Sequence, residues 1–385
     1  MTSYTTASGP LHGIKVIEVE GIGGSPFAAM LLADMGAEVV RIERPQRNSA
    51  EFGGTDPGPV LGRGRRSIIG LNLKSPDGLS LLLDLVREAD VLIEAFRPGV
   101  AERLGFGPDA VHDRNPRLIY GRLTGWGRTG PLAHTAGHDI NYTALAGVLG
   151  AIGRKDSPPA PPLALTGDMG GGGLVLAFGI LAALFERHSS GRGQVVDAAM
   201  VDGAALLMSA FWGFHGRGLW NVERESNPVD GGAPYYDTYK CKDGRYISIG
   251  ALEPQFYTVL CDQLGIDVAH DREKPDAWPR QREELRVLFL SRTCEEWCRL
   301  LEGTDACFAP VLNFETAPSH PHLQARDTFI KLGGIVQPAP APRLSRTPAT
   351  AQPAPVRFAT TRTTLNEWGI EETRILALLE AGILQ

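Results

Sequence analysis

Cysteine is scarce in this chain and absent from its first half, which argues against a fold held together by disulfides. The five cysteines are Cys241, Cys261, Cys294, Cys298 and Cys307. Cys294 and Cys298 stand one helical turn apart, and the chain has no CxxC pair to complete a zinc site. We therefore expect reduced thiols on buried helix faces and no metal site.

The chain also lacks an excess of positive charge, a long apolar run and a targeting segment. It has 385 residues and a formal net charge of −6, which creates no field that would gather nucleic acid. No uninterrupted apolar stretch nears the roughly 20 residues of a membrane span. The start, MTSYTTASGP, does not have the basic and apolar regions of a signal peptide, and the ILQ end is no sorting tail. We expect a cytoplasmic protein without nucleic-acid or membrane partners.

What the sequence does contain is an alternation of strands and helices typical of an α/β protein. Hydrophobic residues make up 43% of the chain and charged residues 21%, and the length predicts two domains. The stretch VIEVEGIGGSPFAAMLLADMGAEVVRIERP predicts a parallel strand–helix–strand unit. Further strands are predicted over 91–94, 117–123 and 195–198, and helices over 77–89, 170–186 and 200–214.

The turn of that first unit resembles a dinucleotide-binding fingerprint without completing it. Gly21 and Gly23 fit the G-x-G-x-x-G pattern, but Pro26 takes the place of the third glycine. Proline suits the first helical turn, where its missing N–H costs nothing. Glu43 stands where an acid would hold a ribose, yet arginines flank it on both sides. The unit therefore predicts a Rossmann-like shape with a different ligand.

Eight basic residues gather near the predicted strand ends and helix starts, where open α/β sheets place their ligands. They are Arg41, Arg44, Arg63, Arg65, Arg66, Lys74, Arg97 and Arg103. Guanidinium groups match phosphate oxygens in a two-pronged way. A solvated surface explains Arg63, Arg65 and Arg66 equally well, whereas a proline directly after Arg44 and Arg97 favours a phosphate role. The chain contains no Walker sequence, which argues against a P-loop nucleotidase.

Three further residues are candidates for chemistry because they stand beside glycine or proline. His138 lies between Gly137 and an aspartate, although a lone histidine is usually structural. Asp168 precedes four glycines, where a helix start would keep its carboxylate ionised, and a plain N-cap is the alternative. We expect the glycines to let the backbone approach a ligand closely. Glu253 before a proline either caps its helix or belongs to the site.

The second half of the chain changes pattern. Residues 216–232 are polar and glycine-rich, a plausible linker, and APYYDTYKCKDGRYISIGA from 233 predicts a β-hairpin. Helices are predicted over 253–264 and over 293–301, the latter with a capping box between Thr293 and Glu296. A proline-rich stretch and a terminal amphipathic helix close the chain.

The sequence resembles the family III CoA-transferases, and within them the racemase branch, along almost its whole length. The matching motifs, in order, are GIKVIEVEGIGGSPFAAMLLADMGAEVVRIERP, EAFRPGVAERLG, TGWGRTGP, AGHDINY, GDMGGGG, GQVVDAAMVDG, GGAPYYDTY, EPQFY and PAPRLSRTP. The resemblance implies an interlocked homodimer with a large Rossmann-like domain over 1–215 and a linker over 216–232. It also implies a small α+β domain over 233–325 and a return segment over 326–385 that packs on the large domain.

The resemblance also implies an acyl-CoA ligand and assigns residues to it. Coenzyme A contacts fall on Arg44, Lys74, Arg97 and Arg103, with Asn72 and Leu73 beside the lysine. The implied reaction inverts the α-carbon of 2-methylacyl-CoA thioesters without a separate cofactor.

The implied catalytic residues are His138 and Asp168, with Glu253 supporting the histidine. An enolate oxygen also needs a donor, and we expect a backbone N–H near His138 and Asp139 to supply it. In the transferase branch the matching aspartate is a nucleophile and a non-basic aromatic residue generally replaces the histidine, so His138 favours the racemase. CoA transfer between carboxylic acids remains the alternative. One departure is Ala164, where the racemases usually have asparagine, which puts the acyl group in doubt.

Overall fold

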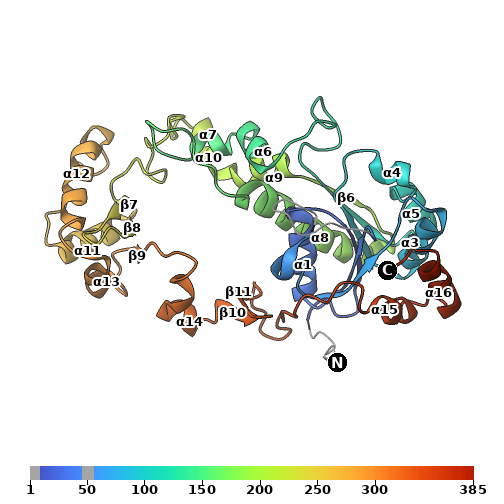
Figure 1. The fold of residues 1–385 in the computed structure, drawn as a ribbon. Helices are drawn as coiled ribbons and strands as arrows, with labels where there is room; N and C mark the ends of the chain where they lie inside the picture. The colour runs from blue at the N-terminus through green and yellow to red at the C-terminus, as the bar shows by residue number, and fades with distance from the viewer. Residues whose placement is uncertain (1–8, 46–55) are drawn as a thin grey trace. The chain divides into compact units, whose positions relative to one another are not determined.

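The computed structural model describes residues 9–45 and 56–385, which form two compact units (Figure 1). The start of the chain, where we expect no signal peptide, lies outside the described residues. The large unit contains the chain up to residue 146 together with 163–207 and 325–385. The small unit contains 147–162 and 208–324, so it includes the predicted linker and an earlier segment in addition to the predicted small domain.

A six-stranded parallel sheet forms the centre of the large unit. Its strands are β1 (Lys15–Val19), β2 (Glu38–Glu43), β3 (Arg65–Gly70), β4 (Val91–Glu94), β5 (Ile119–Thr124) and β6 (Val195–Ala199). They lie in the order β3-β2-β1-β4-β5-β6, and every neighbouring pair is parallel. This is the doubly wound Rossmann order, in which the direction of winding reverses between β1 and β4. The predicted α/β class is confirmed.

Helices cover both faces of this sheet. They are α1 (Gly24–Asp34), α2 (Gly58–Leu61), α3 (Pro76–Glu88), α4 (Val100–Leu104), α5 (Pro108–Arg114), α6 (Asp139–Leu145), the π-helix η1 (Leu165–Leu174), α8 (Val175–Ser190) and α9 (Met200–Leu207). α1 begins at Gly24, so Pro26 does lie in a first helical turn, as predicted. α1 and α8 pack on one face and α3 on the other. Strands buried on both faces explain the nearly continuous apolar runs of the sequence.

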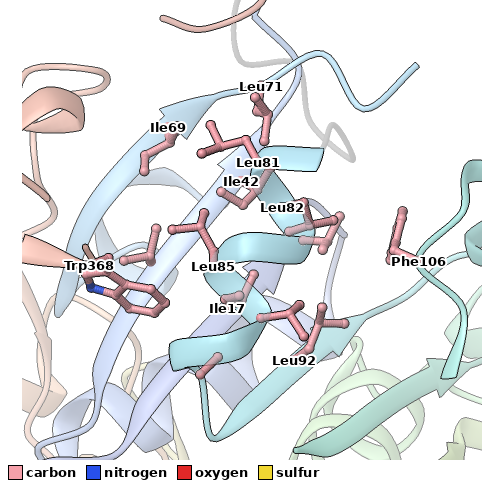
Figure 2. Packing of buried hydrophobic residues seen from close by; sticks show 14 of the residues in the cluster. Ile17, Ile42, Ile69, Leu71, Leu81, Leu82, Leu85, Leu92, Phe106 and Trp368 are labelled. Atoms are coloured by element: carbon pink, nitrogen blue, oxygen red, sulfur yellow. The ribbon is translucent and has the colours of Figure 1, made fainter. Parts of the chain in front are cut away.

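The core on the α3 face joins the sheet to the end of the chain (Figure 2). Leu81, Leu82 and Leu85 of α3 pack on alternate residues of the strands. Trp368, directly after α15 (Thr361–Glu367), closes the same cluster together with Ile375 of α16 (Glu372–Glu380). The last residue also pairs with the sheet, because Gln385 and Gly70 exchange backbone hydrogen bonds of 2.8 and 3.2 Å. The hairpin of β10 (Phe329–Leu332) and β11 (Ile335–Pro338) precedes these helices.

Four of the eight basic residues considered as ligand contacts are arginines that belong to the fold. Arg41 and Arg65 are fully buried and both pair with Glu18 between the sheet and α1. Burial raises the pKa of Glu18, but the two guanidinium groups outweigh it and lower that pKa overall. Arg63 pairs with Asp34 at 2.6 Å. The predicted roles on a solvated surface or a phosphate are therefore wrong for these three arginines.

Arg66, the fourth, pairs with Glu367 of α15 at 2.7 Å and holds the C-terminal segment to the sheet. Glu43, the candidate ribose acid, is buried and pairs with Arg41 and with Arg357, each at 2.7 Å. Glu43 therefore stabilises the fold and is not available to bind a ribose.

The predicted helix over 170–186 is two helices with different hydrogen-bonding patterns. The π-helix η1 begins at Leu165 and continues without a break into α8. Within the described residues, 165–190 is the one segment long and apolar enough to cross a membrane by length and composition, against our expectation of none. Its buried residues pack on α1 and on strands β5 and β6, as those of a core helix do. The predicted helix over 200–214 is likewise divided, into α9 and α10 (Ser209–Gly216).

The small unit is built on a three-stranded antiparallel sheet. Its strands are β7 (Tyr236–Lys240), β8 (Tyr246–Gly250) and β9 (Phe308–Pro310), and β7 and β8 form the predicted hairpin. Its helices are α7 (Val148–Ala151), α10, α11 (Pro254–Leu264), η2 (Pro275–Ala277), α12 (Trp278–Phe289), α13 (Cys294–Leu301), η3 (Ala317–Ser319) and most of α14 (Pro321–Ala325). Thr293 and Glu296 form the predicted capping box. All five cysteines are free thiols.

Candidate active site

Two pockets open at the carboxyl ends of the parallel strands, on either side of the point where the winding reverses. The histidine pocket has a volume of about 260 Å³ and is lined by His138, Asp168 and residues that follow β4 and β5. The lysine pocket has a volume of about 630 Å³ and is lined by Lys74 and residues that follow β1, β2 and β3. Phe96, directly after β4, lines both pockets. This is the location in which open α/β sheets bind ligands.

The lysine pocket brings together five of the six residues predicted to contact coenzyme A. They are Arg44, Asn72, Leu73, Lys74 and Arg103, and the sixth, Arg97, lines the histidine pocket.

These cationic residues differ in whether a carboxylate of the protein already pairs with them. Arg44 pairs with the buried Glu20 at 2.7 Å. Among the described residues, Lys74, Arg97 and Arg103 make no ion pair with a carboxylate and are exposed. Their charges therefore remain available to an anion in the pockets.

His138 is held by the first turn of α6, of which it is the N-cap. Both ends of the peptide group that precedes it are hydrogen-bonded. The hydroxyl of Tyr142 donates to the carbonyl of Gly137, and the N–H of His138 donates to the Asn141 side chain at 3.0 Å. Trp126 packs edge-to-face on Tyr142 and lines the same pocket. This arrangement fixes the backbone of His138 while its imidazole stays exposed.

Asp168 lies in the first turn of the π-helix η1, at a helix start as predicted, and the N-cap is Ala164, so the alternative of a plain N-cap at Asp168 is wrong. Asp139, the first residue of α6, accepts hydrogen bonds from the N–H groups of Gly167 and Asp168 with its Oδ1 atom, both at 2.7 Å. The N–H groups at this helix start are therefore bonded to Asp139 and not to the Asp168 carboxylate. Burial and the neighbouring Asp139 charge raise the pKa of Asp168 to about 6, and His138 opposes this effect.

The four glycines after Asp168 serve close packing within the protein, which corrects our expectation that they face a ligand. A Cβ on Gly173 would stand 2.5 Å from the carbonyl oxygen of Gly24 in α1. A Cβ on Gly171 would stand 2.6 Å from the backbone nitrogen of Ala204 in α9. The glycines let η1 approach both helices at backbone distance. The tract therefore lets η1, which carries Asp168, pack against both α1 and α9.

The remaining predicted residues lie as follows. Glu253 is the exposed N-cap of α11 and belongs to the small unit, whereas His138 belongs to the large unit. Ala164 is the N-cap of η1, and its carbonyl accepts the N–H of Met169. With alanine there, the side chain that holds the backbone of Asp168 is Asp139.

Sequence reasoning missed three contributors to this site: Tyr142, Asn141 and Phe96. Asn141 and Tyr142 belong to the quoted motif AGHDINY, but only their spacing from His138 on a helix would have shown their role. Phe96 is part of EAFRPGVAERLG, and nothing in that motif indicates that it lies between two pockets. Among the described residues, no cluster of three or more histidines, cysteines, aspartates or glutamates has a geometry suited to a metal ion.

Comparison with known proteins identifies the family of this chain. The family model described as CoA-transferase family III matches residues 11–360. The chain belongs to CoA-transferase family III. Alpha-methylacyl-CoA racemase of Mus musculus is 45% identical over 383 residues, and that of Homo sapiens is 44% identical over 380 residues. In each case the match covers 97% of this chain and 97% of the relative. The predicted family is confirmed.

Solved structures share the fold of this chain. The crystal structure of Rv3272 from M. tuberculosis superposes with a TM-score of 0.76 and is 28% identical, covering 93% of this chain and 99% of its own. A CAIB/BAIF family protein from Brucella suis gives a TM-score of 0.79 and is 25% identical, covering 94% of this chain and 100% of its own.

Proposed function

We propose that this protein is a racemase or epimerase that inverts the α-carbon of 2-methylacyl-CoA thioesters by proton transfer through an enolate. The observation that carries the proposal is that His138 and Asp168 line one pocket at the switch point of the sheet. Identity of 44–45% to two alpha-methylacyl-CoA racemases over nearly the full length of the chain supports the same activity.

In this mechanism one proton is shared between the two side chains. His138 removes the α-proton of one stereoisomer and protonated Asp168 delivers a proton to the opposite face of the enolate; the reverse reaction exchanges the roles. The raised pKa of Asp168, about 6, supports this because the carboxyl then holds a proton near the pH at which an imidazole does. The backbone N–H of Asp139, at the start of α6, is the proposed donor to the enolate oxygen.

Coenzyme A enters this reaction as part of the substrate. The proposed arrangement places its phosphates against Lys74, Arg44 and Arg103 in the lysine pocket, with Arg97 at the entrance to the histidine pocket. Phe96 lines both pockets, so a single extended thioester would occupy them together. Proton transfer between two side chains requires no further cofactor.

A homodimer is part of the proposal, and an apolar surface of the large unit supports it. Leu174, Phe178, Leu181 and Phe185 are exposed at intervals of four, three and four residues along η1 and α8. Exposed aromatic and aliphatic side chains in such a row are typical of a helix that packs against another chain. We propose that a second copy covers this surface, named here the α8 surface. Glu253 of the second copy would then support His138.

The experiment that tests the activity is incubation of a single stereoisomer of a 2-methylacyl-CoA in heavy water, without any free carboxylic acid. Exchange of the α-proton together with loss of stereochemical purity is expected, and the His138→Ala variant should show neither. The alternative is CoA transfer with Asp168 as nucleophile, which would require an added carboxylate and would yield a hydroxylamine-trapped acyl enzyme. Full activity of His138→Ala would remove the assignment of the pair.

A further inference from the structure

One turn of α6 holds both members of the proposed catalytic pair. His138 is its N-cap, and the peptide group in front of His138 is fixed by Asn141 and Tyr142. The next residue, Asp139, holds the backbone of Asp168, which is 29 residues later in the chain. Asp139 thus links the histidine to the aspartate.

The side chain of Asp139 is buried against the backbone of Gly167 and Asp168. It is only 7% exposed, and its Oδ1 atom accepts two N–H groups at 2.7 Å. Its Oδ2 atom is buried and, within the described part of the chain, has no hydrogen-bond partner. A buried carboxylate oxygen without a partner is costly, and a second carboxyl group beside it adds to that cost. This arrangement points to a role in the reaction.

We propose that Asp139 is a positioning residue, which holds Asp168 in register with His138 across the histidine pocket. The inference rests on the proposed racemase function and deepens it. Asp139 acts through the backbone of Asp168 and does not touch the reacting carbon with its side chain. Gly167 permits the contact, because any side chain there would collide with the Asp139 carboxylate.

The charge of Asp139 gives the proposal a readout that a structural role alone would not produce. The ionisable groups that act on Asp168 come from α6 and its N-cap: His138, Asp139 and Tyr142. α1 presents Gly23 and Gly24 to Asp168, and Asp202 of α9 acts on Asp197 of β6. A negative charge next to Asp168 keeps its proton bound to higher pH. The pair is active with one proton, so losing this charge moves the acid limb of the pH profile downward.

Two substitutions of the same residue separate position from charge. Asp139→Asn keeps an oxygen that accepts both N–H groups and removes the charge. We expect its kcat to stay within about fivefold of the wild type at the optimum, while the acid limb of kcat/KM moves down by about one pH unit. Asp139→Ala removes the acceptor as well, and its kcat should fall about a hundredfold with KM within about twofold, because the groups proposed to bind coenzyme A are unchanged.

The matched control is Asp202→Asn, which removes one exposed negative charge from α9 and should leave both kcat and the pH profile unchanged. Equal losses of kcat in Asp139→Asn and Asp139→Ala, or an acid limb that does not move in Asp139→Asn, would overturn the proposal. If Asp139→Ala does not fold, the pH profile of Asp139→Asn still tests whether the charge of Asp139 acts on Asp168.

Titration of the Asp168 carboxyl by carbon NMR, assigned by comparison with Asp168→Asn, provides a test that does not depend on turnover. A midpoint that is lower in Asp139→Asn than in the wild type is expected, and an unchanged midpoint would contradict the inference. Absence of α-proton exchange in the wild type would instead contradict the proposed racemase function and leave this titration to decide the role of Asp139.

Discussion

Gly23 lies directly against the carboxyl group of Asp168. A Cβ at position 23 would stand 2.5 Å from Oδ2 and 3.1 Å from Cγ of that side chain. Gly23 also has a φ of +59°, in the left-handed region that favours glycine, and it is the N-cap of α1. The glycine that resembles part of a dinucleotide fingerprint therefore makes room for an acid of the protein. The βαβ unit at the start of the chain supports one wall of the proposed site.

Gly23→Ala should therefore reduce catalysis more than it reduces stability. The new methyl group displaces the Asp168 carboxyl, and a displacement of about 1 Å at a reacting group can cost about a hundredfold in rate. We expect kcat for α-proton exchange to fall at least tenfold while KM for the acyl-CoA changes little. Steady-state exchange in heavy water at several substrate concentrations measures both quantities.

The control for this variant is Gly58→Ala. Gly58 has a φ of +65°, and a Cβ there would meet no atom within 4 Å. Alanine at position 58 would therefore have the backbone strain of about 1 kcal/mol without a collision with a neighbouring side chain. Equal kcat values in the two variants would show that Gly23 acts through its backbone alone.

Lys74, Arg97 and Arg103, which have no carboxylate partner among the described residues, should bind coenzyme A through its phosphates. Lys74→Ala and Arg103→Ala are each expected to raise KM about tenfold, since a hydrogen bond to a charged group contributes about 1.5 kcal/mol, and to leave kcat nearly unchanged. Added salt should weaken the binding of the wild type more than that of either variant.

A truncated substrate makes this test specific. An acyl-pantetheine thioester lacks the nucleotide phosphates, so both variants should turn it over with the same KM as the wild type. Arg87→Ala removes a cation from α3 that pairs with Asp84 and does not line either pocket, and it should leave both values of KM unchanged. A rise in KM for the truncated thioester in Lys74→Ala would contradict a phosphate role.

The fold was predictable where burial alone determines the structure. The strands β1 and β4 are short apolar runs bounded by turns, and the helix α3 repeats its leucines at helical spacing, so pattern and structure agree. The π-helix η1 was not predictable, because its form follows from contacts of Gly171 and Gly173 with helices distant in sequence. Periodicity carries no information about such contacts.

The sequence was sufficient to predict which residues belong to the site, but not how they are arranged in space. The resemblance named His138, Asp168 and the cationic residues, and the structure brings them to two pockets that share Phe96. The arginines of β2 and β3 were misjudged because a sequence does not show which carboxylate a buried cation meets. Arg65, for example, meets Glu18 of a strand 47 positions away.

The α8 surface should be required for self-association. Phe178→Glu places a charge at the centre of an apolar surface that we propose a second copy covers, and burying an unpaired charge is costly. We expect this variant to sediment with the mass of one chain at concentrations where the wild type has twice that mass. Activity should fall with it, because Glu253 is proposed to come from the second copy.

Leu376→Glu is the control for this substitution. Leu376 is an exposed leucine of α16 outside the α8 surface, so a charge there should leave the mass in solution unchanged. A wild-type protein that sediments with the mass of one chain at all concentrations would contradict the proposed dimer.

The raised pKa of Asp168 should also appear in the stability of the fold. Burial and the Asp139 charge raise this pKa from 3.8 to about 6, so the folded state binds the proton more tightly than the unfolded state does. Folding is then favoured below pH 3.8, and the contribution of Asp168 is lost as the pH rises through 6. Asp168→Asn, which resembles the protonated acid, should have a larger free energy of unfolding than the wild type at pH 8.

Urea unfolding of both proteins at a series of pH values measures this difference. We expect about 1 kcal/mol at pH 8, less than the full value for a pKa change of this size because Asp168 is partly exposed and solvent screens its charge. The difference should shrink as the pH falls and vanish well below pH 3.8, where Asp168 is neutral in both the folded and the unfolded wild type. Asp113→Asn, on the exposed side of α5, controls for the loss of a negative charge. If Asp168→Asn is no more stable than the wild type at pH 8, the carboxyl group is not held in an environment that favours its protonated form.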